Sequence, residues 1–368
     1  MLDFQKILVR AWQILWNYRA LWVFGFILAL ASGGGGGGGN NYSARENSNQ
    51  FFSGEGLEQF QGKTPGELFN AMVQMLGQAL RHLQERFPVE FQMGIAAIVF
   101  AFLVFSLFGL ALTILRYVAE AATIRMVDEY EQSGLKVGFW QGWRYGWSRA
   151  AWRLFLLDVL VHLPLLVMFT VIGLVIWWIL SAALSGVRAS LATALIAGIG
   201  LVFVTAVVII VLVTVLRLVR DLAWRSIVLE NLTVLDAFRQ ALTLGKRQWK
   251  NVGLMWLMMI GIGIVWTLLF FIIVFPLLAV SILTGLLGLL TALIPGLLTA
   301  GVAALFSVPD YWPWIFAAII GLPIFIVIWL APIFLVDGWA KIYASSVWTL
   351  TYRELKALEA LKSDLTQG

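Results

Sequence analysis

Long apolar runs, separated by short polar segments, dominate the pattern of this chain. A helix needs ~20 apolar residues to cross the ~30 Å of hydrocarbon in a bilayer. Five stretches with almost no charge are long enough, namely residues 91–115, 154–184, 189–216, 251–309 and 311–336. A weaker sixth stretch, residues 14–31, contains Arg19, whose long side chain can reach the headgroups. The pattern predicts an all-α polytopic transmembrane helical bundle with about six spans.

The composition supports this class and excludes several kinds of site. The chain is 61% hydrophobic and 12% charged, whereas soluble domains are nearer ~25% charged. It has no cysteine, which excludes disulfides, thiolate metal sites and cysteine nucleophiles. It has two histidines, so the usual zinc ligand sets are hard to assemble. We expect no cofactor and no bound metal.

Basic residues indicate the orientation. If the chain crosses six times with both termini in the cytoplasm, most of the 25 Lys and Arg residues lie inside. The exceptions are Arg45, Lys63, Arg81, Arg86 and Arg188. The whole chain has a net charge of +5. In a membrane protein such an excess usually comes from cytoplasmic Lys and Arg residues that face anionic lipid headgroups. We therefore expect membrane lipids as partners, and no nucleic acid.

Three segments of the chain begin alike, which indicates an internal repeat. The motifs are Phe4-x-Lys-Ile-x-x-x-Ala, Phe139-x-Gln-Gly-x-x-x-Gly and Phe238-x-Gln-Ala-x-x-x-Gly, and Trp16, Trp152 and Trp249 follow them. We interpret each unit as an interfacial amphipathic helix, a span out and a span back. The units cover about 2–131, 136–230 and 236–362 of a single domain, 1–368. Chance likeness among apolar helices is the alternative.

Two insertions distinguish the units. Residues 32–88 form an extracytoplasmic loop that opens with a glycine run, followed by an amphipathic helix that starts at the capping box Thr64-Pro-Gly-Glu67. Residues 277–314 are apolar, and Ile294-Pro295-Gly296 divides them into two halves that are short for a span. This favours a re-entrant insertion. The alternative, one seventh span, would place the C-terminus outside.

Ionisable groups inside spans are costly, so they are candidates for function. Asp158 and His162 lie four residues apart and therefore share a helix face. Together with Arg19 they form a candidate intramembrane polar site that could relay protons or bind a cation. The plainer alternative is that Asp158 pairs with a nearby arginine.

Charged pairs recur where spans leave the membrane. The candidate boundary ion pairs are Arg116 with Glu120, Arg217 with Asp221, and Asp337 with Lys341. Each is spaced i, i+4, so the two side chains can meet on one helix face. Anchoring of helix ends is the simpler interpretation, and a cytoplasmic gate is the alternative.

Basic and aromatic residues alternate in two segments beside the spans. The candidate lipid-interface residues are Trp140, Trp143, Arg144, Trp147, Arg149, Trp152 and Arg153 in one segment, and Lys246, Arg247 and Trp249 in the other. Such helices bind anionic lipid through charge and indole insertion. The alternative is general anchoring without a choice of lipid.

The residues that carry a likeness to a known family are spread along the chain. They are Ala11-Trp12, Leu15-Trp16, Leu21-Trp22, Asp236-Ala-Phe238, Trp249-Lys-Asn251 and Tyr352-Arg-Glu-Leu355. These segments resemble the membrane domain of bacterial glycerophosphoryl diester phosphodiesterases and related multi-span proteins of prokaryotes. The resemblance implies an inner-membrane location. It does not imply phosphodiesterase activity, because in those enzymes a soluble barrel supplies the chemistry and this chain ends at Gly368.

The sequence contains none of the common catalytic motifs G-x-S-x-G, H-E-x-x-H or EF-hand. The leading hypothesis is therefore a non-enzymatic membrane scaffold or accessory protein that binds a protein partner or a second copy. The alternative is a transporter, channel or lipid-moving protein that uses the repeat interface. A third hypothesis, a membrane enzyme acting on lipid, depends on Asp158, His162 and Arg19.

Overall fold

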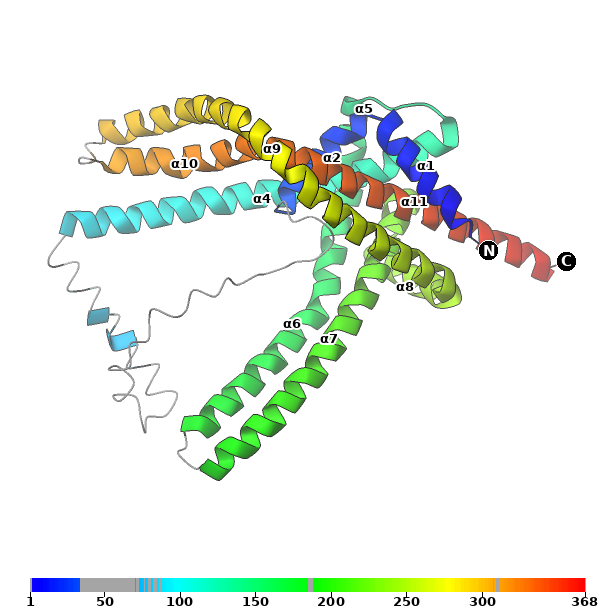
Figure 1. Ribbon diagram of the computed structural model, residues 1–368, viewed down its shortest axis with the longest axis horizontal. Coiled ribbons are helices and arrows are strands. Elements are labelled where there is room, and N and C mark those ends of the chain that lie inside the picture. The colour runs from blue at the N-terminus through cyan, green and yellow to red at the C-terminus, as the bar shows by residue number, and fades with distance from the viewer. Residues whose placement is uncertain are drawn as a thin grey trace. The chain divides into compact units, whose positions relative to one another are not determined.

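A computed structural model describes residues 2–33, 88–184, 188–306, 308 and 311–367, with isolated residues between 70 and 85. Its helices are α1 (Phe4–Asn17), α2 (Ala20–Ala31), α4 (Pro88–Ser133), α5 (Phe139–Gly146), α6 (Arg149–Leu184), α7 (Arg188–Glu230), α8 (Val234–Arg247), α9 (Trp249–Leu305), α10 (Trp312–Trp329) and α11 (Ala331–Gln367) (Figure 1). None of the described residues lies in a β-strand. The predicted loop and amphipathic helix of residues 32–87 lie almost entirely outside the described part.

The described helices confirm a polytopic helical membrane protein. Five of them, α4, α6, α7, α9 and α10, are long and apolar enough to cross a bilayer. A sixth crossing is present if α1 and α2 together form one broken span. Most of their large apolar side chains are exposed, as expected for helices whose solvent is hydrocarbon.

The predicted first span, residues 14–31, is not one helix. The chain turns by 100° between α1 and α2, and Arg19 lies in this break. The two helices have different apolar patterns, because α1 buries one face (Ile7, Ala11, Ile14) whereas α2 is apolar on all sides. The indole of Trp22 donates to the carbonyl of Leu15 and ties the two helices together across the bend.

Helix α9 runs unbroken past Pro276 and Pro295, so residues 294–296 do not interrupt the helix. Its second half packs antiparallel on α10, where Gly285 lies beside Trp329, Gly288 beside Phe325 and Gly296 beside Ala317. Neighbouring helices allow proline inside membrane helices, because they help to satisfy the freed backbone groups. At ~1.5 Å per residue α9 is far longer than one bilayer crossing requires. Re-entry of this segment stays a prediction.

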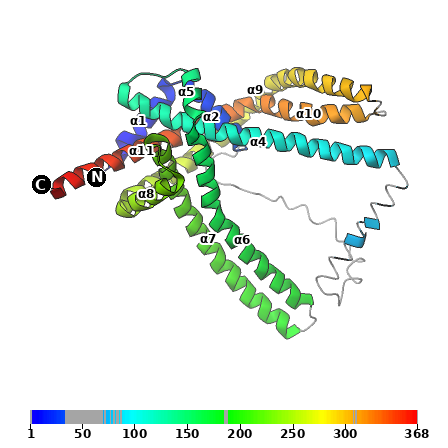
Figure 2. The ribbon, with the colours of Figure 1, turned by 180° about the vertical axis from the view of Figure 1, so that it is seen from behind.

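The chain divides into two compact units. One unit comprises residues 41–96 and 160–216. Its described part includes the first turns of α4 and a pair of helical arms, from α6 and α7, that run side by side in both views (Figures 1 and 2). The other unit comprises residues 1–40, 97–159 and 217–368 and contains the remaining helices. The candidate site lies entirely in this second unit, which we call the core unit.

Helix α11 forms the centre of the core unit. It packs against α1, α2 and α9, and its side chains also reach α4 and α7. Its buried residues include four small hydroxyl side chains, Ser345, Ser346, Thr349 and Thr351, among larger apolar ones. Small residues let membrane helices approach closely, and hydroxyl groups can bond back to their own helix. Both properties suit a helix that is surrounded by others.

At three places, α1–α2, α5–α6 and α8–α9, one helix follows another after a break of one or two residues, which we call an elbow. A side chain at or just after each elbow hydrogen-bonds a backbone carbonyl of a distant segment: Tyr18 bonds Val137, Arg153 bonds Asn231 and Gln248 bonds Leu355. Helices α4 and α7 both end at a residue with positive φ, Gly134 and Asn231. These parallels agree with the predicted three-unit repeat, which remains a prediction.

Candidate functional site

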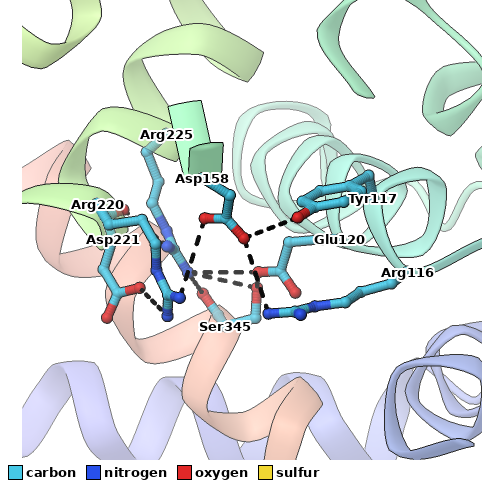
Figure 3. Close-up of polar contacts among 8 residues, drawn as sticks. All are labelled: Arg116, Tyr117, Glu120, Asp158, Arg220, Asp221, Arg225 and Ser345. Atoms are coloured by element: carbon cyan, nitrogen blue, oxygen red, sulfur yellow. Dashed lines mark hydrogen bonds and ion pairs between the residues drawn. The ribbon is translucent and has the colours of Figure 1, made fainter. Parts of the chain in front are cut away.

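Three helices of the core unit bring charged side chains together, and a fourth adds a serine. Helix α4 contributes Arg116, Tyr117 and Glu120, α6 contributes Asp158, α7 contributes Arg220, Asp221 and Arg225, and α11 contributes Ser345 (Figure 3). We call these eight residues the charge cluster. Buried arginine and carboxylate groups need partners, because burial removes the water that would otherwise solvate them.

Asp158 lies on one side of the charge cluster. The hydroxyl of Tyr117 donates to its Oδ2 at 2.9 Å. Guanidinium nitrogens of Arg116 and Arg220 each lie 4.0 Å from its carboxylate oxygens, and only 7% of the Asp158 side chain is exposed. The structure therefore places Asp158 beside arginines, as in the plainer of the two sequence interpretations.

Arg225 is the most deeply buried charge of the cluster, with 2% of its side chain exposed. It donates to the backbone carbonyls of Asp221 at 2.7 Å and Ser345 at 3.2 Å, and it lies 3.8 Å from Glu120. The Ser345 hydroxyl donates to the same Glu120 carboxylate at 2.9 Å. Arg225 thus links α7 to both α4 and α11.

The pairing expected along α4 needs correction. Arg116 and Glu120 were predicted to pair with each other, but Arg116 faces Asp158 and Glu120 faces Arg225 and Ser345. Asp221 lies 3.5 Å from Arg220. Apart from the neighbouring pair Arg220 and Asp221, the partners come from other helices, because a buried charge gains more from a desolvated neighbour than from an i, i+4 partner that faces solvent.

The six charged side chains in Figure 3 balance one another. Three arginines (Arg116, Arg220 and Arg225) face three carboxylates (Glu120, Asp158 and Asp221). Arginine does not release its proton in proteins, so the positive side of this balance is permanent. The arrangement is suited to holding four helices together.

Asp337 and Lys341 form the third predicted pair, with 3.5 Å between the ammonium and the carboxylate. Asp337 is fully buried, and neither of its carboxylate oxygens accepts a hydrogen bond. Burial raises the pKa of Asp337 above its ordinary value, and the neighbouring Lys341 ammonium opposes this rise. The next residue, Gly338, lies where α11 crosses α2 at Gly25.

The other members of the predicted intramembrane site have different surroundings. Arg19 is exposed at the break between α1 and α2 and is not a partner of Asp158. His162 is exposed on α6. The sequence therefore identified Asp158 as a buried polar position but did not identify Tyr117, Arg220, Arg225 or Ser345 as its surroundings.

A second layer of ion pairs lies near the helix ends and was not expected from the sequence. Arg10 pairs with Glu131 at 2.7 Å, Lys356 with Glu230 at 3.1 Å, and Arg353 with Asp128. Tyr352 also donates to Glu230, and burial raises the pKa of this tyrosine. Every pair joins two different helices, so no short spacing in the sequence could have indicated it.

The predicted lipid-interface residues fall into two groups. Trp140, Trp147, Trp152 and Trp249 are 78%, 61%, 63% and 66% exposed, and Arg144 and Arg149 are exposed as well. Arg153 instead donates hydrogen bonds to the backbone carbonyls of Asn231 and Leu232, and the Arg247 guanidinium lies 3.8 Å from the Glu359 carboxylate. Lys246 is exposed on α8.

Helix α5 is held in place by two glycines. A Cβ at Gly146 would lie 2.2 Å from the carbonyl oxygen of Val118, and one at Gly142 would lie 2.3 Å from the sulfur of Met126. The glycine face of α5 therefore presses on α4, and the opposite face is exposed. There Trp143, Arg144 and Trp147 line an open depression of about 420 Å³.

Within the described residues, no group of three or more His, Cys, Asp or Glu side chains could hold a metal ion. The charge cluster also lacks such a set, because each of its carboxylates faces an arginine.

Comparison with known proteins places the chain in one family. No curated protein and no solved structure shows significant similarity to it. A family model matches residues 10–358, and that span contains the charge cluster, all three elbows and nearly all of α11. The chain belongs to this family, which is described as a family of unknown function, DUF7544.

Proposed function

We propose that this protein is a non-enzymatic scaffold or accessory protein of a prokaryotic inner membrane. The observation that supports this proposal is the charge cluster, in which ionisable groups from α4, α6 and α7 are engaged with one another and with Ser345 of α11. Asp158 faces Tyr117 and two arginines, and Glu120 faces Arg225 and Ser345.

A transport or catalytic role would need ionisable groups that change partner or protonation state during the cycle. In the charge cluster the cations are arginines, which remain protonated. A neutral set of paired charges costs less to bury than unpaired ones, but it gains little over apolar packing. The paired charges instead determine which helices pack together. A rigid helix bundle of this kind suits a protein that holds other proteins in position.

Location and orientation belong to the same proposal. Both termini lie in the cytoplasm, and the amphipathic helices α1, α5 and α8 lie on the cytoplasmic leaflet. The basic and aromatic side chains of α5 and α8 support this arrangement, because anionic lipid attracts arginine and lysine and the interface attracts indole. The resemblance to the membrane domain of glycerophosphoryl diester phosphodiesterases supports the inner membrane.

Cross-linking in native membranes followed by mass spectrometry tests the scaffold role. We expect one protein partner, or a second copy of the chain, to be linked reproducibly to wild type. The purified protein is then assayed with glycerophosphodiester and phospholipid substrates. Turnover that is lost in D158N or H162A would contradict the proposal, and so would a protein that is never linked to any other chain.

The second candidate is a transporter, channel or lipid-moving protein. The observation that favours it is the 100° break between α1 and α2, since discontinuous helices often border binding sites in transporters. Proteoliposomes loaded with pH-sensitive dye or labelled lipid provide the test. Flux that depends on Asp158 and His162 would favour this candidate, and equal leak with wild type, D158N and H162A would remove it.

A further inference from the structure

The exposed face of α5 and the elbow that follows it are basic. Arg144 and Arg149 are both exposed, and neither is paired with a carboxylate in the described part of the chain. By contrast, Arg10 pairs with Glu131 and Arg247 with Glu359. Two unpaired guanidinium groups therefore lie five residues apart around one elbow.

Four tryptophans lie close in sequence to these two arginines. Trp143 and Trp147 stack with 6.1 Å between ring centroids and 21° between ring planes, and they line the open depression with Arg144. Trp140 and Trp152 flank the depression along the chain and are largely exposed. Indole prefers the boundary between hydrocarbon and headgroups, and guanidinium binds phosphate oxygens in a two-pronged geometry.

The chain also places this depression at a membrane boundary. Helix α6 is long and apolar enough to span, and it begins at Arg149, three residues after α5 ends. The volume of about 420 Å³ lies in the ~300–1,000 Å³ range of small-ligand sites. Because the depression is open, it suits a headgroup that the bilayer already holds in place better than a free solute.

We propose that Trp143, Arg144, Trp147 and Arg149 form a binding site for one anionic phospholipid headgroup. The two arginines contact the phosphate, and the indoles border the glycerol and the upper acyl chains. A zwitterionic headgroup would bring a cation towards two unpaired guanidinium groups, so the site should prefer phosphatidylglycerol to phosphatidylcholine. This inference rests on the proposed position of α5 at the membrane surface and adds a choice of lipid to it.

Native mass spectrometry of the full chain in detergent, titrated with phosphatidylglycerol or phosphatidylcholine, tests the site. We expect the first phosphatidylglycerol to bind more tightly than phosphatidylcholine in wild type. The R144Q/R149Q variant should raise the Kd for that lipid about thirtyfold, because each basic group near a membrane surface is worth ~1 kcal/mol. The single variants should each raise it about fivefold, so they serve if the double variant does not fold.

R10Q is the matched control, because Arg10 is also a partly exposed arginine beside an aromatic ring, that of Tyr130, but has Glu131 as a partner. We expect it to keep the lipid preference of wild type. Equal losses in R10Q and R144Q/R149Q would overturn the specific site and leave the general membrane-surface role of the amphipathic helices standing. Unchanged binding in R144Q/R149Q would also overturn it. Competition by soluble glycerol phosphate would assign the depression to a free solute and overturn the lipid assignment.

Discussion

Single buried side chains carry much of the specificity of the core unit, and Arg225 is the clearest case. Its guanidinium is almost fully buried and contacts Glu120, Ser345 and the Asp221 carbonyl. If Arg225 is replaced by methionine, Glu120 loses its cationic partner in a low-dielectric region. Loss of one partner of a buried ion pair costs ~3–5 kcal/mol.

We therefore expect R225M to lower the apparent melting temperature in detergent strongly, as measured by light scattering or near-UV circular dichroism. The double variant E120Q/R225M should recover much of the loss, because it removes both charges together. R247M, which removes a surface arginine, should change stability by less than ~1 kcal/mol. An R225M protein as stable as R247M would show that the charge cluster does not hold the helices.

Asp337 makes stability depend on pH. In the unfolded chain an aspartate has a pKa near ~3.9, and burial raises the value for Asp337 in the folded protein. The folded protein therefore keeps this proton over a range of pH where the unfolded chain has lost it. The stabilisation is complete below the unfolded pKa and is lost as pH rises through the folded pKa.

We expect the melting temperature of wild type to fall as pH rises above ~4, and D337N to lack this contribution. At neutral pH, D337N should be at least as stable as wild type. E354Q, which removes an exposed carboxylate from the same helix, should keep the wild-type dependence. The same slope in D337N and wild type would contradict a buried, proton-retaining Asp337.

Glycines allow close contact between helices, and the crossing of α2 and α11 has one on each helix, Gly25 and Gly338. A Cβ added to Gly338 would lie 2.6 Å from the carbonyl carbon of Gly25 and 2.8 Å from the amide nitrogen of Phe26. Both are backbone atoms, so no side-chain rotation can relieve the overlap. Close crossing at small residues is a common way for membrane helices to pack.

We expect G338A to separate α2 from α11 and to cost ~1–3 kcal/mol, as overpacking of a well-packed site does. G109A is the control, because Gly109 lies inside α4 with no atom near its added Cβ. That substitution should be neutral or stabilise the helix by up to ~1 kcal/mol. The two variants are compared by thermal unfolding in the same detergent, and equal stability would argue against the close crossing.

The chain as a whole is expected to have both termini in the cytoplasm. The protein has no cysteine, so single cysteines report sidedness without further changes. In intact cells, a membrane-impermeant maleimide should label S53C, in the loop predicted to lie outside. It should label Q5C and E354C only after the membrane is opened. Labelling of E354C in intact cells would place the C-terminus outside and support a seventh span.

The local sequence pattern accounts for the helices and for their placement in hydrocarbon. Uncharged stretches of sufficient length predicted the long helices α4, α6, α7 and α9, because transfer of apolar side chains to hydrocarbon dominates their energy. Capping and periodicity also indicate the short amphipathic helices, of which α8 begins at Thr233, whose side chain caps the helix. These properties depend on residues within a few turns of each other.

Interactions between distant segments required the folded chain. Glu120 meets Ser345 across 225 positions of sequence, and Arg10 meets Glu131 across 121. Hydropathy and i, i+4 spacing carry no information about such partners, so Arg116 and Glu120 were paired with each other in error. The bend at Arg19 and the unbroken α9 have the same origin. At both positions the local sequence is compatible with a bend and with a straight helix. The bend is found where α1 and α2 pack on α11, and the straight helix where α9 packs on α10.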